Sequence, residues 1–500
     1  MSKSASITLD PGFVIGPVRR RLFGSFVEHM GRCVYTGIYE PGHPGADERG
    51  LRRDVLDLTR ELGASIVRYP GGNFVSNYRW EDGAGPLHER PVRLDLAWRS
   101  IEPNAFGVGE FAAWARQAGV EPMLAVNLGT RGIREAAELL EYCNHPGGTE
   151  LSDLRAKHGD AQPYGVRVWC LGNEMDGPWQ IGRRTADEYG RLAAETAKAM
   201  RRIDPSVELV ACGSSNRGMP TFAAWEAAVL EHSYDLVDYV SVHGYYEPHG
   251  DDVDSFLASA TEMDGCIEEI AATADYVKAR LRSTKRLLIS FDEWNVWHQQ
   301  RFGGEDSLDW AHAPRLIEDT YSVADAVVVG SLLISLLSHA DRVGIACQAQ
   351  LANVIAPIRT EPGGSAWRQA TFYPFAQAAR LACGSVLRVE PASPLLPTAR
   401  YGPVPAVHVA ATHDPESGRT ALFAVNRDRT EPVRLTVDAR ALRPSRITEH
   451  QTLHDADLGA MNTHARPDRV VPRPGEQASV DSGTLTLGLP PASWNVLQFC

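Results

Sequence analysis

The sequence predicts an α/β protein, a (β/α)₈ TIM barrel followed by a C-terminal all-β sandwich domain. Eight short apolar runs with strand character recur through the first three-quarters of the chain, and helical patterns fill the gaps between them. After Gly384, short strand-like segments alternate with turns. We therefore expect a catalytic barrel over residues 18–380 and a β-sandwich over residues 381–500. A strand over residues 5–15 is expected to complete the sandwich.

The predicted barrel strands are rich in Val, Ile and Leu and show little alternation of apolar and polar positions. This pattern is typical of strands that are buried on both faces of a parallel sheet. They span Leu22–His29, Ser65–Tyr69, Met123–Asn127, Val166–Gly172, Glu208–Cys212, Tyr239–His243, Leu287–Phe291 and Val343–Cys347.

Apolar residues recur at helical spacing between these strands, as in Leu51–Leu62, Gly109–Ala118 and Ile133–Tyr142. Thr185 with Glu188 is a capping-box pattern that predicts the start of another helix. A doubly wound sheet is the alternative to a barrel. We favour the barrel because polar residues follow the strands all round the chain and not at one crevice only.

The C-terminal part has a different character, with five short strand candidates separated by turn-like segments. This alternation predicts an all-β sandwich. The candidates are Val407–Ala411, Thr420–Val425, Val433–Val437, Thr484–Leu489 and Trp494–Phe499.

Charge and hydropathy exclude several classes of partner. The chain has 50 basic and 63 acidic residues, a formal net charge of −13, so we expect neither nucleic acid nor membrane as a partner. The longest apolar run, Ala326–Leu337, is too short for a membrane span and predicts a buried helix. The N-terminal segment MSKSASITLD has no apolar signal core, which favours a cytoplasmic protein.

The eight cysteines are scattered and form no CxxC pair, which suits free thiols in a reducing compartment. The same spacing gives little support to structural zinc. His243 and His249 have no third ligand at a useful spacing, so a hydrogen-bonding role is the better interpretation of these residues. We therefore expect no metal and no other cofactor.

Polar side chains gather at the carboxyl ends of the predicted barrel strands, where barrel enzymes place their active sites. The set contains carboxylates, amides and aromatic rings but few cations, which suits a neutral polyhydroxylated ligand, that is, a sugar. Its members include Glu28, His29, Asn73, Asn127, Asn173, Glu174, Asn216, His243, Tyr245, Glu293 and Gln350.

Two of these carboxylates follow the fourth and seventh predicted strands, Glu174 and Glu293. Cleavage of a glycosidic bond needs one protonated carboxyl group to release the leaving oxygen and one ionised carboxylate. Because strands four and seven face each other across a barrel mouth, this pair predicts a glycoside hydrolase. Strand alternation turns Asp292 away from Glu293, which predicts a structural role for Asp292.

Several longer stretches carry a resemblance to a known family. They are Phe23–His29, Gly37–Pro44, Arg68–Phe74, Trp98–Asn104, Leu171–Gln180, Phe291–Trp297 and Ala349–Pro357. With these stretches the sequence resembles the α-L-arabinofuranosidases of glycoside hydrolase family 51 over nearly its whole length. One departure is Thr36, where a glycine would be expected, and it lies outside the catalytic motifs.

The resemblance implies a retaining, metal-independent hydrolase that releases terminal arabinofuranosyl residues from arabinose-containing oligosaccharides. It implies Glu174 as the general acid/base and Glu293 as the nucleophile. It also implies a homo-oligomer, often a hexamer. The residues implied to hold the furanose ring are Glu28, Asn73, Asn173, Tyr245 and Gln350, and those implied to shape the pocket are His243, Trp297 and Trp98.

Two other functions stay open at this point. A glycosidase on the same scaffold could act on galactofuranosides, xylosides or β-glucans. A sugar-binding protein without catalysis is a second alternative, which the intact pair of Glu174 and Glu293 disfavours.

Overall fold

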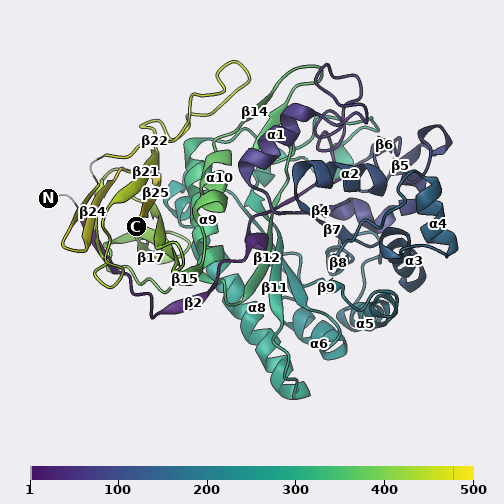
Figure 1. Ribbon diagram of the computed structural model, residues 1–500, viewed down its shortest axis with the longest axis horizontal. Helices are drawn as coiled ribbons and strands as arrows, with labels where there is room; N and C mark the ends of the chain where they lie inside the picture. Colours follow the sequence, from purple (N-terminus) through teal and green to yellow (C-terminus); the bar gives the residue numbers. More distant parts are fainter. Residues whose placement is uncertain (1–2, 477) are drawn as a thin grey trace.

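The computed structural model describes residues 3–476 and 478–500, so Met1 and Ser2 of the N-terminal segment and Gln477 lie outside the described residues. The chain folds into two parts that lie side by side (Figure 1). A barrel with its surrounding helices contains most of the first 380 residues, and a β-rich part contains the C-terminal residues together with the N-terminal strands.

Eight parallel strands close into a barrel in chain order, which confirms the predicted fold class. Each of the eight predicted strands is present with bounds that differ by a few residues. They are β3 (Gly24–Phe26), β4 (Ile66–Tyr69), β7 (Glu121–Ala125), β8 (Val168–Leu171), β9 (Glu208–Ala211), β10 (Tyr239–Tyr246), β11 (Leu288–Val296) and β12 (Val343–Ala349).

The sixth and seventh barrel strands, β10 and β11, continue past the expected ends at His243 and Phe291. The register of this pair shifts by one residue between Ser241 and His243, since His243 pairs with Glu293 although Ser241 pairs with Ser290. Such an extra residue in one strand is a β-bulge, which re-aims the side chains that follow it. Glu293 therefore lies inside β11.

Helices surround the barrel, and their apolar faces cover the strands. The capping box at Thr185 is present, and Gly63 ends the first helix in the left-handed conformation that favours glycine. The helices are α1 (Arg53–Leu62), α2 (Val108–Ala118), α3 (Ile133–Asn144), α4 (Glu150–Lys157), α5 (Ala186–Ile203), α6 (Ala224–Ser233), α7 (Val253–Leu257), α8 (Ala260–Leu281), α9 (Val323–Ser338) and α10 (Phe372–Leu381).

Three two-stranded sheets lie in the described segments that connect the larger elements. They pair β5 (Arg93–Asp95) with β6 (Ser100–Glu102), β13 (Ile358–Thr360) with β14 (Ala366–Arg368), and β16 (Leu395–Thr398) with β17 (Gly402–Pro405).

Two further sheets pack against each other in the β-rich part, around a core of Val, Leu and Ala side chains from both. The four-stranded sheet has the order β1 (Lys3–Thr8), β20 (Val433–Asp438), β24 (Thr484–Leu489) and β23 (Ser479–Asp481). The seven-stranded sheet has the order β2 (Val14–Pro17), β15 (Ser385–Leu387), β18 (Val407–Asp414), β19 (Arg419–Asn426), β25 (Ser493–Phe499), β21 (Ile447–Leu453) and β22 (Arg473–Pro474).

The N-terminal segment contributes one strand to each of these sheets, β1 beside β20 and β2 beside β15. The single strand expected over residues 5–15 is thus two strands with a turn between them. We propose that the division at residues 380 and 381 separates two domains, since α10 ends the barrel at Leu381 and β15 begins at Ser385.

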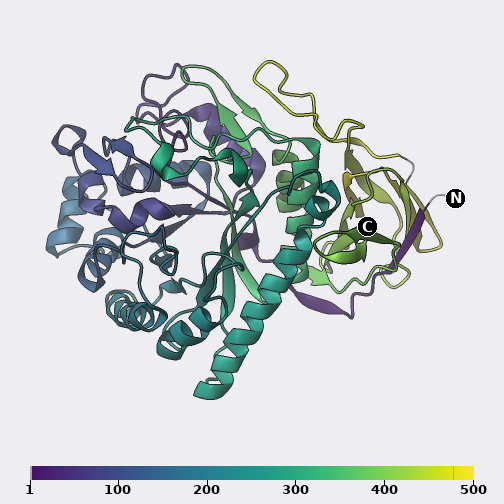
Figure 2. The same ribbon diagram turned by 180° about the vertical axis from the view of Figure 1, so that it is seen from behind.

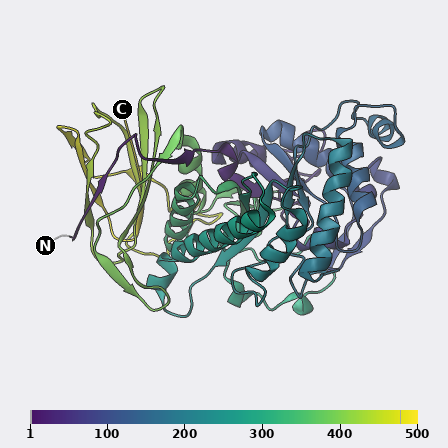
Figure 3. The same cartoon turned by 90° about the horizontal axis from the view of Figure 1, so that it is seen from below.

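The two parts share a packed interface, in which α9 and α10 lie between the barrel and the seven-stranded sheet (Figures 2 and 3). Trp494 of β25 is buried there and packs so closely on Gly330 that a Cβ atom at this glycine would lie 2.4 Å from the indole ring. The apolar run that predicted a buried helix is α9, and that prediction is confirmed. Among the described residues, no helix has both the length and the apolar composition needed to cross a membrane.

Candidate active site

A cavity of about 570 Å³ opens among the loops at the carboxyl ends of the barrel strands. Nine of the ten residues that the resemblance implies to be catalytic or sugar-binding line it, from six barrel strands or the loops that follow them. These are Glu28, Asn73, Trp98, Glu174, His243, Tyr245, Glu293, Trp297 and Gln350. Asn173 lies behind this lining and is buried.

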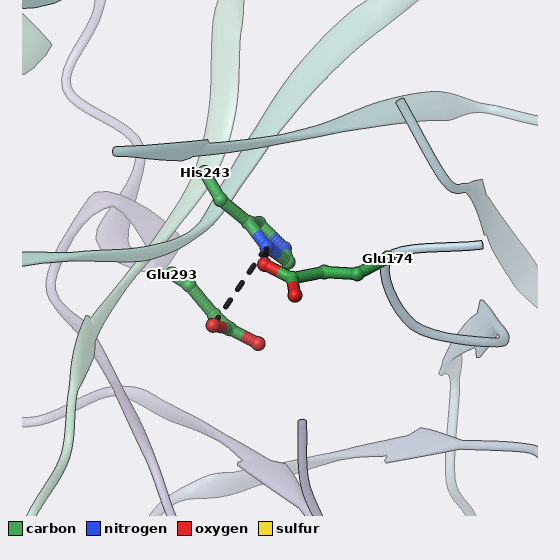
Figure 4. Close-up of side chains that lie close together, drawn as sticks. All are labelled: Glu174, His243 and Glu293. Carbon is green, nitrogen blue, oxygen red and sulfur yellow. Dashed lines mark hydrogen bonds and ion pairs between the residues drawn. The ribbon is translucent and has the colours of Figure 1, made fainter. Parts of the chain in front are cut away.

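Glu174 and Glu293 approach each other closely from opposite sides of the cavity (Figure 4). One carboxylate oxygen from each of them and a ring nitrogen of His243 all lie within 4.8 Å of one another. Both carboxyl groups are almost completely buried. The structure therefore brings together the two carboxylates that the sequence analysis paired.

The Glu174 carboxyl group is held by two neighbours. Its Oε1 is 2.9 Å from Nδ1 of His243, and its Oε2 accepts a hydrogen bond of 2.7 Å from Nε1 of Trp179. The backbone of Glu174 has a φ of 44°, in the left-handed region that costs a non-glycine residue about 1–3 kcal/mol. Backbone strain of this kind often marks a functional position.

Burial raises the pKa of Glu174, and the negative charge of Glu293 raises it further. The hydrogen bond from His243 acts in the opposite direction. Burial also disfavours the charged form of His243, but the carboxylates of Glu293, Asp292 and Glu174 outweigh it and raise the pKa of this histidine to about 10. An imidazolium has no free lone pair, so a metal ion would have to displace this proton to bind among the three clustered side chains.

Glu293 has a different set of partners. Its Oε1 accepts a hydrogen bond of 2.6 Å from Nη1 of Arg68, and its Oε2 accepts one of 2.8 Å from the hydroxyl group of Tyr245. The ring of Tyr245 in turn meets Trp297 edge-on, with the ring centroids 5.3 Å apart. Both oxygens are therefore fixed, and the carboxylate is held in one rotamer.

Glu28 accepts hydrogen bonds at Oε1 from the backbone of Phe74 at 3.0 Å and from Nε1 of Trp98 at 2.9 Å. Burial and the charge of Glu293 raise the pKa of Glu28 to about 8. A Cβ atom at Gly72 would lie 2.5 Å from the Glu28 carboxylate. The Gly71–Gly72 pair is thus needed for the close approach of the backbone to Glu28.

The amides of the site form a layer next to these carboxylates. Gln350 directs Nε2 toward Oε2 of Glu28 at 3.3 Å. Asn173 accepts a hydrogen bond of 2.7 Å from Nη2 of Arg68, and its Nδ2 points toward Oδ1 of Asn73 at 3.4 Å. These contacts leave part of the hydrogen-bonding capacity of each amide for a ligand.

Arg68 is a central residue to which sequence reasoning assigned no role. It lies in β4, is fully buried, and contacts Glu293, Asn173 and, at 3.6 Å, Asp292. The available signal was a lone arginine inside an otherwise apolar strand, because a cation buried inside a barrel needs an anionic partner.

The prediction that Asp292 points away from Glu293 is wrong. Asp292 accepts a hydrogen bond of 2.5 Å from Ser241 and lies 3.3 Å from Nε2 of His243, so Asp292 and Glu293 contact the same histidine. The β-bulge between β10 and β11 breaks the alternation on which the prediction rested. Burial tends to raise the pKa of Asp292, but Arg68 and His243 hold it below its usual value.

Comparisons with known proteins agree with this geometry. Residues 58–264 match the family described as "Alpha-L-arabinofuranosidase 1 domain", and residues 292–493 match "Alpha-L-arabinofuranosidase C-terminal domain". The chain is 60% identical over 499 residues to an intracellular exo-α-(1→5)-L-arabinofuranosidase of Streptomyces lividans, covering 99% of this chain and 75% of the relative. It is 53% identical over 508 residues to an exo-α-(1→6)-L-arabinofuranosidase of Bifidobacterium longum, covering 99% of this chain and 97% of the relative.

A solved structure of a family 51 α-L-arabinofuranosidase from Bifidobacterium longum superposes with a TM-score of 0.96 at 46% identity. The superposition covers 100% of both chains. The identity, the full coverage and the two matching domain families lead to one assignment. The chain belongs to the α-L-arabinofuranosidases of glycoside hydrolase family 51.

Proposed function

We propose that this protein is a retaining, exo-acting α-L-arabinofuranosidase that releases terminal non-reducing arabinofuranosyl residues from arabinose-containing oligosaccharides. The observation that carries the proposal is the close approach of the Glu174 and Glu293 carboxylates in one cavity. Retaining glycosidases keep their two carboxyl groups about 5–5.5 Å apart, whereas inverting enzymes need roughly 6.5–9.5 Å to admit a water molecule.

In the first step, a Glu293 oxygen attacks the anomeric carbon as the bond to the leaving oxygen breaks, and Glu174 gives its proton to that oxygen. This step forms an ester between Glu293 and the sugar. In the second step, Glu174 takes a proton from water, the water oxygen bonds to the anomeric carbon, and the ester breaks. The raised pKa of Glu174 supports its role as the acid in the first step.

The furanose ring is proposed to lie against Glu28, Asn73, Asn173, Tyr245 and Gln350, with His243, Trp297 and Trp98 shaping the pocket. Trp98 acts through its hydrogen bond to Glu28, which fixes that carboxyl group. Nε1 of Trp297 is buried and has no acceptor among the described residues, so a sugar hydroxyl group could satisfy it.

The names of the relatives support the substrate class and differ in linkage, (1→5) for one and (1→6) for another. We include both linkages in the proposal and leave the choice to assay. The relative from Streptomyces lividans is named intracellular, which supports a cytoplasmic location. A homo-oligomer, with a hexamer as the expected state, remains a prediction that light scattering during gel filtration would test.

The test is hydrolysis of p-nitrophenyl α-L-arabinofuranoside beside the β-D-galactofuranoside and the β-D-xylopyranoside. We expect strong release from the arabinoside alone, and its loss in Glu293→Ala. Azide should restore part of the activity of that variant and give a glycosyl azide of inverted configuration. Release mainly from another glycoside would change the substrate that we assign. Full activity of Glu293→Ala would refute the assignment of Glu293 as the nucleophile.

A further inference from the structure

The cavity extends beyond the two carboxylates toward the loop after β9 and the first turns of α8. This extension, the side lobe, is lined by Ser215, Asn216, Arg217, Gly218, Tyr246, Glu262 and Cys266. It belongs to the same 570 Å³ cavity as Glu174 and Glu293. Since β8 and β9 are neighbours in the barrel, the lobe lies next to the strand that Glu174 follows.

Two charged side chains of the side lobe are each held along one edge and free along the other. Arg217 uses Nε and Nη2 to bind the Glu269 carboxylate at 2.8 and 2.6 Å. Its guanidinium group packs over Gly265 of α8, where a Cβ atom would lie 3.1 Å away. Among the described residues, Nη1 of Arg217 has no hydrogen-bond acceptor. A donor of fixed orientation therefore remains available to a ligand.

Glu262 is anchored by the C-terminal part of the chain. Its Oε2 accepts a hydrogen bond of 2.9 Å from the hydroxyl group of Tyr401 and lies 3.5 Å from Nη2 of Arg400. Both residues belong to the turn between β16 and β17, and the backbone N–H of Arg400 donates to Ser255 at 3.1 Å. In the part of the chain that the structure describes, Oε1 of Glu262 has no donor.

We propose that the side lobe is a subsite for the leaving-group sugar, which Arg217 and Glu262 bind through its hydroxyl groups. This inference rests on the proposed function. The leaving oxygen receives its proton from Glu174, so the leaving sugar lies on the side of the cavity next to β8 and β9. A carboxylate acceptor and a guanidinium donor with one free edge each suit a neutral ligand that carries several hydroxyl groups.

Tyr401 is, in this proposal, a positioning residue through which the C-terminal domain orients Glu262. It does not need to touch the sugar. Its hydroxyl group fixes one oxygen of the Glu262 carboxylate, which leaves the other oxygen at the lobe. The predicted consequence is selective, because loss of the contact affects substrates with a sugar leaving group more than an aryl glycoside.

The experiment compares kcat/KM on α-(1→5)-L-arabinotriose with kcat/KM on p-nitrophenyl α-L-arabinofuranoside. In Glu262→Gln and Arg217→Gln, the ratio of trisaccharide to aryl glycoside should fall by about tenfold, the size of one hydrogen bond to a charged group. In Tyr401→Phe, which keeps the ring and removes the hydroxyl group, it should fall by about fivefold. We expect the change mainly in KM for the trisaccharide.

Arg429→Gln is the matched control, because Arg429 joins the same two domains through Asp254 at 2.8 and 2.9 Å and does not line the cavity. Its substrate ratio should equal that of the wild type. If Tyr401→Phe does not fold, Glu262→Gln gives the same test. Unchanged ratios in Glu262→Gln and Arg217→Gln, in an active wild-type background, would overturn the subsite. A wild type inactive on both arabinosides would instead overturn the proposed function itself.

Discussion

The two ends of the barrel use the same residue types in opposite ways. At the amino ends of the strands, Arg21 lies between Glu121 and Glu208, and Tyr239 donates to Glu208 at 2.7 Å. At the carboxyl ends, Arg68 and His243 lie among Glu174, Asp292 and Glu293. The cluster at the amino ends, called the lower cluster, is partly exposed to water, whereas the cluster at the carboxyl ends, called the upper cluster, is buried.

The difference appears in the acids. Burial tends to raise the pKa of Glu208, but the hydrogen bonds from Arg21 and Tyr239 outweigh burial and lower it. For Glu174 and Glu28 burial prevails and the charge of Glu293 adds to it, so their pKa values are raised. The lower cluster is thus arranged for stability, whereas burial in the upper cluster raises the pKa of Glu174, the residue proposed as the acid.

The largest expected effect comes from removing Glu174, the proposed acid of the upper cluster. Glu174→Ala should lower kcat/KM on arabino-oligosaccharides by about 10²–10⁴-fold, because a sugar leaving group needs a proton. The loss should be much smaller on p-nitrophenyl arabinofuranoside, whose leaving group departs without one. Steady-state kinetics on both substrates measure the difference, and Glu208→Gln is the control carboxylate from the other end. Equal losses on both substrates would contradict the assignment.

Next in size is the loss of the buried cation. Arg68→Gln leaves Asp292 and Glu293 without their shared arginine, and breaking a buried pair in this way costs about 3–5 kcal/mol of unfolding free energy. Activity should fall as well, since Glu293 loses the donor that fixes Oε1. Urea unfolding followed by tryptophan fluorescence measures the stability change. A change below 1 kcal/mol would show that Arg68 is not needed to offset these charges.

An arginine-to-glutamine substitution in the lower cluster should lower the stability by less than Arg68→Gln does, and it should leave the activity unchanged. Arg21→Gln removes hydrogen bonds to two carboxylates that water still reaches, so we expect a loss of about 1–2 kcal/mol. At 25 °C kcat/KM should equal that of the wild type. A clear loss of activity in a folded Arg21→Gln protein would mean that the two ends do not differ in the proposed way.

The smallest expected effect is a shift in pH dependence. Asp292 helps to keep His243 protonated, so Asp292→Asn should lower the pKa of His243. Near and above neutral pH the neutral histidine would no longer counteract the rise in the pKa of Glu174. The alkaline limb of kcat/KM, which reports deprotonation of this acid, should therefore move to higher pH by less than one unit. A shift to lower pH would contradict this coupling through His243.

Much of the barrel could be predicted because its strands are buried on both faces and so form apolar runs in the sequence. In the β-rich part, strand β21 could not be recognised from an apolar run, because its interior residues are polar and only Ile447 and Leu453 at its ends are apolar. Glu174 follows the end of β8 as expected, whereas Glu293 lies inside β11, two residues past the end that was predicted for this strand. These two residues required no knowledge of tertiary contacts.

The sequence analysis missed the roles of three other residues, each for a different physical reason. The role of Asp292 depends on a bulge, which has no signature in the sequence of β11. The placement of Glu262 depends on a hairpin turn more than 130 residues away, and periodicity carries no information about that contact. Arg68 is different, because a charged residue in an apolar strand is visible in the sequence and predicts a buried ion pair.

The most direct test of the paired carboxylates is the configuration of the first product. Proton NMR during rapid hydrolysis of an α-L-arabinofuranoside by the wild-type enzyme should show α-L-arabinofuranose first and the other forms only later, as the free sugar equilibrates. Two displacements at the anomeric carbon, by Glu293 and then by water, require this order. Initial formation of the β-anomer would mean a single displacement by water and would contradict Glu293 as the nucleophile.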